Sequence, residues 1–134
     1  MLVLVAFALG CANQINCAPC SPPANIEVTS IRPTVDSVRV CLDTRCGGIR
    51  TLQPEQQGIR VDGAIYDHSS VTLETFADGK RLGSYLITGL ALRRPSGRNC
   101  DCGESVDLIP QPGGRLVTRQ QLTSATPATT SPTR

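Results

Sequence analysis

Aromatic side chains are nearly missing from this sequence of 134 residues, which has no Trp, two Tyr and two Phe. One of the two Phe, Phe7, lies in an N-terminal segment that we expect the mature protein to lose. The core must therefore be small and aliphatic, and small cores of exported proteins are commonly reinforced by covalent cross-links. Sugar-binding surfaces usually present Trp or Tyr, so this class of function is disfavoured.

The sequence also has no excess of charge of one sign. Thirteen Lys and Arg face eleven Asp and Glu, which gives a formal net charge of +2. Nucleic-acid-binding proteins normally need a concentrated basic face, so we expect no nucleic-acid partner. The chain has no Gly-rich phosphate-binding loop between a strand and a helix. We therefore predict no catalytic residue, no cofactor and no enzymatic activity.

The longest apolar run, residues 1–10, reads MLVLVAFALG and ends in a small residue directly before Cys11. Spanning a bilayer as a helix takes about 20 apolar residues, so this run is too short. We interpret it as a signal segment. Residues 8–11 resemble the bacterial lipobox, in which the signal is cut before the cysteine and the thiol is acylated. Two acyl chains would make a stable anchor, at about 0.8 kcal/mol per buried methylene. A secretory signal cut elsewhere, or a first core strand of a cytosolic protein, is the alternative.

The number of cysteines supports this interpretation. Seven is odd, and an odd cysteine in an exported protein requires an explanation. Acylation of Cys11 removes one and leaves six, which can form three bridges in fifteen possible pairings. The six disulfide candidates are Cys17, Cys20, Cys41, Cys46, Cys100 and Cys102.

The spacing of these cysteines narrows the pairings. Cys41 and Cys46 flank the short turn LDTR and could close a local loop worth about 2 kcal/mol. A bridge between Cys100 and Cys102 would be strained, and one within residues 17–20 is little better, so pairing across the two clusters is favoured. Each such loop of roughly 80 residues would contribute about 4.5 kcal/mol on the chain-entropy model. Which cysteine of one cluster meets which of the other stays open.

Residues 25–119 carry short strand signals separated by Gly, Pro and Asp. Val38, Val40 and Leu42 alternate with polar or small residues in the pattern of a half-buried strand. Further strands are predicted around residues 26–31, 59–61, 64–66, 105–109 and 115–118, with a hairpin of 71–76 and 81–92 joined by an Asp-Gly turn. About seven strands without helical periodicity predict an all-β domain, an antiparallel immunoglobulin-like sandwich.

Two segments flank this domain. Residues 11–24 are polar and rich in proline, and we interpret them as a tether. Residues 120–134 are rich in Thr, Ser and Pro, so we predict a disordered tail.

Three stretches carry a resemblance to a known group of proteins. They are SVRVCLDTRCGG, YLITGLALRRPSGRNCDC and ESVDLIPQPGGRLV. Together they resemble small exported lipoproteins of actinobacteria, over residues 26–118. The resemblance implies an immunoglobulin-like sandwich and a place in the cell envelope, and it implies no particular activity.

Two cysteine clusters could instead carry chemistry. The Cys-Ala-Pro-Cys of residues 17–20 is similar to the motif of thioredoxin-like oxidoreductases, which place the first thiol at a helix N-terminus to lower its pKa. Here the motif lies in the tether, so we favour structural disulfides. A zinc site made by Cys17, Cys20, Cys100 and Cys102 has an acceptable ligand count, but oxidation competes with zinc binding outside the cell. We predict no metal site.

The single histidine, His68, lies in the segment Tyr-Asp-His-Ser-Ser of residues 66–70. Neighbouring residues cannot easily form a catalytic triad, which is built by convergence in space, so we interpret the segment as a turn. Arg93, Arg94 and Arg98 form a basic loop that we expect to be solvated. Contact with phospholipid or cell-wall phosphates is the alternative.

These features predict a monomeric lipoprotein anchored by Cys11 on the extracytoplasmic face of the cell membrane. We expect it to act as a binding or structural module with an envelope protein or the cell wall as partner. A thiol-redox or metal-binding module, and a surface exclusion or immunity lipoprotein, are the alternatives.

Overall fold

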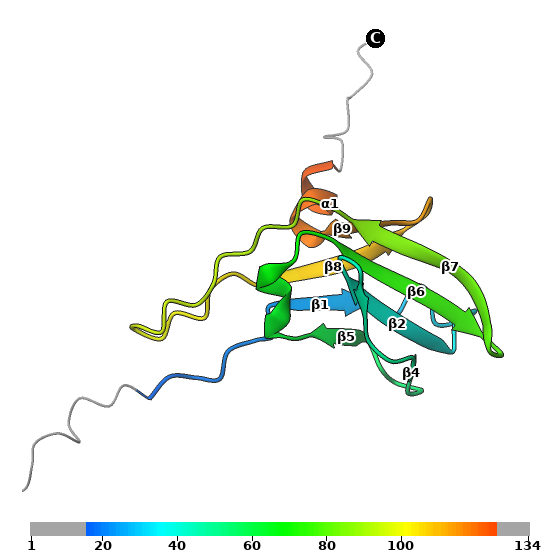
Figure 1. Cartoon of the computed structure of the whole chain (residues 1–134), viewed down its shortest axis with the longest axis horizontal. Helices are drawn as coiled ribbons and strands as arrows, with labels where there is room; N and C mark the ends of the chain where they lie inside the picture. The colour runs from blue at the N-terminus through cyan, green and yellow to red at the C-terminus, as the bar shows by residue number, and fades with distance from the viewer. Residues whose placement is uncertain (1–15, 126–134) are drawn as a thin grey trace, which may run out of the picture.

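The computed structural model describes residues 16–125, which form nine strands and two short helices (Figure 1). The strands are β1 (Ala24–Glu27), β2 (Ser37–Leu42), β3 (Arg45–Cys46), β4 (Arg50–Thr51), β5 (Gly58–Val61), β6 (Val71–Ala77), β7 (Lys80–Ile87), β8 (Val106–Gln111) and β9 (Arg115–Thr118). A 3₁₀ helix, η2 (Gly63–Asp67), follows β5, and α1 (Arg119–Ala125) follows β9. Residues 1–15, with the predicted signal segment and Cys11, lie outside the described residues.

All the strands belong to one curled sheet, with the order β3-β2-β6-β7-β9-β8-β1-β5 and with β4 beside β2 (Figure 1). The pairs β1–β8 and β7–β9 are parallel, and the others are antiparallel. The all-β prediction is confirmed. The expected antiparallel immunoglobulin-like sandwich is not what the strands form, because they curl into a mixed half-barrel. Strand patterns show which residues are buried and leave the partners of each strand undetermined.

The hairpin of β6 and β7 forms where the sequence predicts it. Asp78 and Gly79 adopt φ angles of 52° and 76°, and positive φ at both central positions suits the twist of a two-residue hairpin turn. The second strand ends at Ile87 and does not reach Leu92. Residues 64–66, predicted as a strand, lie in η2, because Asp62 caps this helix by accepting a hydrogen bond from the Ala64 amide at 3.1 Å.

The core fills the inner face of the curled sheet with aliphatic side chains. The largest side chains that are fully buried come from five strands, from η2 and from the residue after β1: Ile26, Val28, Val38, Ile59, Ile65, Val71, Leu73 and Leu108. Within residues 16–125, Phe76 is the one aromatic side chain that is buried. The scarcity of aromatics is thus matched by a core of branched aliphatic residues.

A short helix occupies the start of the predicted tail, and this part of the prediction is wrong. The Thr118 hydroxyl accepts from the Gln121 amide at 3.0 Å, and the Gln121 side chain accepts from the Thr118 amide at 2.9 Å. This reciprocal pair is a capping box, and it starts α1. The Arg119 guanidinium then pairs with the Glu27 carboxylate of β1. The rest of the predicted tail, residues 126–134, lies outside the described part of the chain.

Candidate functional site

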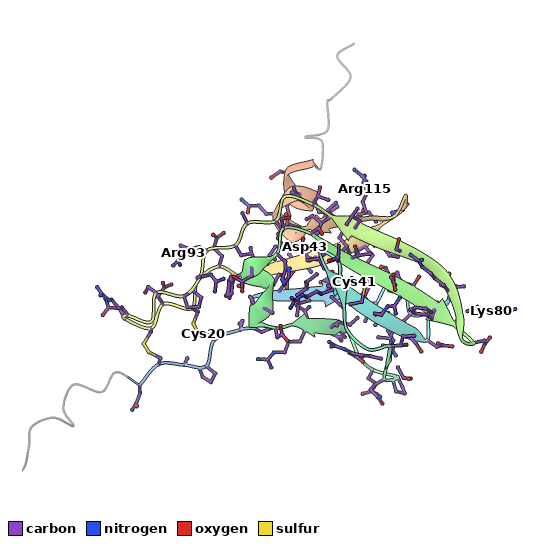
Figure 2. All side chains as sticks on the ribbon, in the orientation of Figure 1. Cys20, Cys41, Asp43, Lys80, Arg93 and Arg115 are labelled. Atoms are coloured by element: carbon purple, nitrogen blue, oxygen red, sulfur yellow. A yellow bond between two sulfur atoms is a disulfide. The ribbon has the colours of Figure 1, made fainter. Side chains whose placement is uncertain are left out.

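Three disulfides join the six cysteines of the described residues: Cys17–Cys100, Cys20–Cys102 and Cys41–Cys46 (Figure 2). The prediction of a local bridge beside the LDTR turn and of cross-pairing between the two clusters is confirmed. A Cys-x-Pro-Cys redox centre uses a bridge within the motif, and here each motif cysteine is bonded to the other cluster. A zinc site would need these sulfurs as thiolates.

The two long-range bridges tie the N-terminal segment to the loop between β7 and β8, and Figure 1 shows both extending to the same side of the sheet. Cys20 stands four positions before Ala24, the first residue of β1, and Cys102 stands four positions before Val106, the first residue of β8. Ala24 and Val106 are partners in the parallel pair. The bridges therefore hold together the starting ends of two strands that lie far apart in the sequence.

The basic loop is braced by its own ion pairs. Arg93 donates two hydrogen bonds to Asp101, at 2.7 and 2.8 Å, and its backbone amide donates to Glu104 at 2.7 Å. The guanidinium of Arg93 holds the pKa of the Asp101 carboxyl well below its usual range, while Asp101 raises the pKa of Arg93. Arg94 pairs with Asp67, the last residue of η2. Two of the three arginines predicted as a solvated patch thus hold the loop in shape.

His68 contacts an aspartate that the sequence did not single out. Its Nδ1 lies 2.9 Å from Oδ2 of Asp43, and Oδ1 of Asp43 accepts from the amides of Ser69 and Ser70 at 3.2 and 3.0 Å. The bond with His68 lowers the pKa of Asp43 to about 2. Both serine hydroxyls bond to Asp43 and neither bonds to His68. This arrangement fixes the turn after β2 to the loop before β6, and it is unlike a triad.

A cavity of about 250 Å³ lies between the two margins of the curled sheet. One wall comes from β2, β3, β4 and the turns beside them, and the other from β5, η2 and the loop that follows. The residues that line it are Val40, Leu42, Arg45, Cys46, Gly47, Arg50, Arg60, Val61, Asp62, Ala64 and His68.

Arginine dominates the charge of this cavity. Arg45, Arg50 and Arg60 are exposed, and none has a side-chain partner among residues 16–125. The acidic residue of the lining, Asp62, accepts the capping hydrogen bond of η2. Sequence reasoning missed this set because its members are 5 and 10 positions apart on three different strands. A spacing of this kind carries no motif.

One further group of possible metal ligands occurs on the sheet. Atoms of Cys41, Cys46 and Glu74 lie within 4.8 Å of one another. The two sulfurs are bonded to each other, and Glu74 pairs with Arg39 at 2.5 Å and with Arg81 at 3.6 Å. The donors of this group are therefore engaged with one another or with cations.

Comparisons with protein-family models, with curated proteins and with solved structures found no match to this chain. Among residues 16–125, no helix is long and apolar enough to cross a bilayer.

Proposed function

We propose that this protein is a lipoprotein anchored through Cys11 on the extracytoplasmic face of the cell membrane, where it acts as a binding or structural module of the envelope. One observation carries the proposal: the six described cysteines form three disulfides. Cys11 is then the one cysteine left over, and it follows the apolar run of residues 1–10 directly. An unpaired cysteine at this position has the right place to receive an acyl group.

The kind of disulfide supports an oxidising compartment. Two of the bridges join cysteines 82 and 83 positions apart, and structural bridges of this sort persist in exported proteins, whereas cytosolic thiols are kept reduced. The small aliphatic core agrees with a domain that relies on cross-links.

The binding role is supported by what the fold presents to its surroundings. The curled sheet leaves one cavity between its margins with three unpartnered arginines. The ion pairs of the loop between β7 and β8 keep a second exposed segment in a fixed shape. A partner protein or a wall polymer could contact either surface without any chemical step.

The test of the anchor is the intact mass and the detergent partition of the protein extracted from membranes. We expect a mass increase that corresponds to acylation at Cys11, cleavage after residue 10, and partition into the detergent phase. The Cys11→Ala variant should lack the added mass and partition into the aqueous phase. Partition of both proteins into the aqueous phase would contradict the proposal.

Peptide mapping without reduction separates this function from a thiol-redox or metal-binding module. We expect Cys17, Cys20, Cys100 and Cys102 to appear only in cross-linked peptides. Free thiols at Cys17 and Cys20 in protein isolated from its native membrane would favour the redox alternative.

A further inference from the structure

The half-barrel is open along one seam, and the cavity lies in this seam. The path of paired strands ends at β5 on one side and at β3 on the other, with β4 also beside β2. β4 and β5 belong to opposite margins, and Figure 1 shows them near each other in the lower part of the view. The cavity is lined by residues of both margins. Ligand sites in proteins are concave, lined by apolar side chains and a few polar or charged groups.

The seam also brings together three arginines that have no acidic partner among residues 16–125. Elsewhere in residues 16–125, five arginines pair with acidic groups, among them Arg39 with Glu74 and Arg93 with Asp101. Arg98 and Arg115, which lie outside the cavity, have no acidic partner. Arg45, Arg50 and Arg60 have no such partner in the described part of the chain, although all three line one cavity. Like charges that line one cavity repel each other, and an anion bound among them would reduce this repulsion.

The balance of charge indicates which anion fits. Three arginines and Asp62 give the lining a net charge of about +2, without counting His68. A carboxylate brings one negative charge, whereas a phosphate monoester brings about −1.5 to −2 at pH 7 and three acceptor oxygens. Guanidinium groups are planar forks that match phosphate oxygens in pairs. The electrostatics thus favour phosphate over a single carboxylate.

The apolar part of the cavity indicates that the ligand is larger than phosphate alone. Val40, Leu42 and Val61 contribute buried or half-buried apolar surface to the wall. The cavity volume is about 250 Å³. A phosphate group has five non-hydrogen atoms, and at about 30 Å³ for each, the volume of one water molecule in the liquid, it would leave part of the cavity empty. His68 adds a polar group, since its Nδ1 is held by Asp43 and its Nε2 has no partner among the described residues.

We infer that this cavity binds a phosphate ester, with the phosphate held by Arg45, Arg50 and Arg60 and a small organic substituent against the apolar wall. The inference rests on the proposed function, because it names the ligand class of the binding module. The phosphate can come from a soluble ester or from a lipid headgroup, and the chemistry of recognition is the same.

Calorimetric titration of the full chain with glycerol 3-phosphate tests the inference, with glycerol as the uncharged control. We expect saturable binding of the phosphate ester and none of glycerol. The double variant Arg50→Gln/Arg60→Gln should weaken binding at least tenfold. The matched control Arg98→Gln/Arg115→Gln removes the same charge from two arginines outside the cavity, and Figure 2 places Arg115 over β9, away from β4 and β5. It should change the affinity by less than about twofold.

Vesicle sedimentation distinguishes the source of the phosphate. An acyl anchor inserts into phosphatidylcholine and phosphatidylglycerol vesicles alike, so the informative quantity is the excess binding to phosphatidylglycerol. If this excess is lost in Arg50→Gln/Arg60→Gln and the soluble ester does not bind, the ligand is a lipid headgroup and the inference stands.

Two results would overturn the inference. One is the absence of binding both to glycerol 3-phosphate and to phosphatidylglycerol above phosphatidylcholine. The other is an equal loss in the two double variants, which would show a bulk charge effect. The urea midpoints of all variants should agree, because the four arginine side chains are exposed. Failure here leaves the mass and partition of the anchored protein unchanged, so the two proposals can fail separately.

Discussion

At the scale of single residues, Asp43 connects two parts of the chain that are 25 to 27 positions apart. It occupies the turn between β2 and β3 with a φ of 51°, a conformation that Asp and Asn tolerate better than other non-glycine residues. Its carboxylate accepts hydrogen bonds from Ser69 and Ser70 and contacts His68. The turn that contains Asp43 is therefore fixed to the segment of His68, Ser69 and Ser70, and His68 lines the cavity.

Acid should release this contact. The pKa of Asp43 lies at about 2 in the folded protein, below its ordinary 3.8, chiefly because of the bond with His68. A lowered folded-state pKa adds stability that is present above the ordinary pKa and is lost as the pH falls from about 4 towards 2. We expect the Asp43→Asn variant to lose stability at neutral pH and to show a smaller further loss across this window. Thermal unfolding at pH 7 to 2 measures both, and Asn keeps the φ of the turn accessible.

Glu55 offers the control for the acid measurement, because its side chain makes no hydrogen bond or ion pair among the described residues. Glu55→Gln, which removes the charge of an exposed carboxylate, should unfold at nearly the same temperature as the parent protein at pH 7. An Asp43→Asn curve that runs parallel to the parent curve from pH 4 to pH 2 would contradict the assigned role of the carboxylate.

Leu73 tests the aliphatic core. It is 0% exposed on β6, whereas Leu82 on β7 is 53% exposed. Leu73→Ala should lower the free energy of unfolding by about 3 kcal/mol through lost burial and the cavity left behind. Leu82→Ala, the same chemical change, should alter it by less than about 0.5 kcal/mol. Urea unfolding gives both values, and similar losses in the two variants would mean that the inner face is assigned wrongly.

At the scale of elements, the two long-range disulfides act on the parallel pair of β1 and β8. In the unfolded chain Cys20 and Cys102 are 82 positions apart. In the folded chain Cys20 lies four positions before β1 and Cys102 four positions before β8, and these two strands are paired with each other even without the bridge. Loop closure costs about (3/2)RT ln n. The difference between a loop of 82 residues and one of roughly eight amounts to about 2 kcal/mol. This is less than the roughly 4.5 kcal/mol that the full loop implies.

Replacing Cys17, Cys20, Cys100 and Cys102 by Ser should therefore lower the free energy of unfolding by about 2 kcal/mol. Removing only Cys17–Cys100 should have a smaller effect, since Cys20–Cys102 closes nearly the same loop. Urea unfolding of the two variants beside the parent measures this. Equal losses from the double and the quadruple variant would contradict the view that the bridges are redundant.

Gly103 follows the second bridge and tests the packing of the loop between β7 and β8. Its φ is +72°, and an added Cβ would lie 2.6 Å from the Arg93 carbonyl oxygen and 2.7 Å from the Pro95 nitrogen. Gly97 has a similar φ of +75° with nothing within 4 Å of such an atom. Both Gly→Ala changes carry backbone strain of about 1 kcal/mol. Gly103→Ala should lose about 2 kcal/mol more, because the backbone on the other side must move.

Hydrogen exchange gives a second readout for this pair of variants. The Glu104 amide donates to the Arg93 carbonyl oxygen at 2.9 Å, so its protection should fall in Gly103→Ala and persist in Gly97→Ala. Equal behaviour of the two variants in both measurements would mean that the close approach at Gly103 does not matter.

At the scale of the whole molecule, local patterns predict much of the structure. Alternation predicts β2, and the Asp-Gly turn predicts the β6–β7 hairpin. Parity and spacing of the cysteines predict the local bridge and the cross-pairing. These features depend on residues that are close in sequence or on a simple count. The Thr-x-x-Gln pattern of the capping box at Thr118 and Gln121 is also present in the sequence. The helix was not predicted from it because the following residues are rich in Thr, Ser and Pro.

The sheet order and the cavity could not be predicted in this way. Nothing in residues 24–27 indicates that they pair in parallel with 106–108 on one side and antiparallel with 58–61 on the other. The seam is a consequence of these pairings, so the meeting of Arg45, Arg50 and Arg60 is a property of topology. The same holds for Asp43 and His68, since long-range contacts leave no periodic trace in a single sequence.

The two long-range disulfides determine how a pulling force passes through the molecule. Tension applied between Asn16 and the end of α1 passes from Cys17 directly to Cys100, or from Cys20 to Cys102, and then runs along β8, β9 and α1. The chain between the bridged cysteines, from β1 to β7, lies outside this path and cannot be extended while the bridges hold. All residues that line the cavity fall between Val40 and His68. A molecule held at one end and pulled at the other would thus keep its cavity shielded from the load.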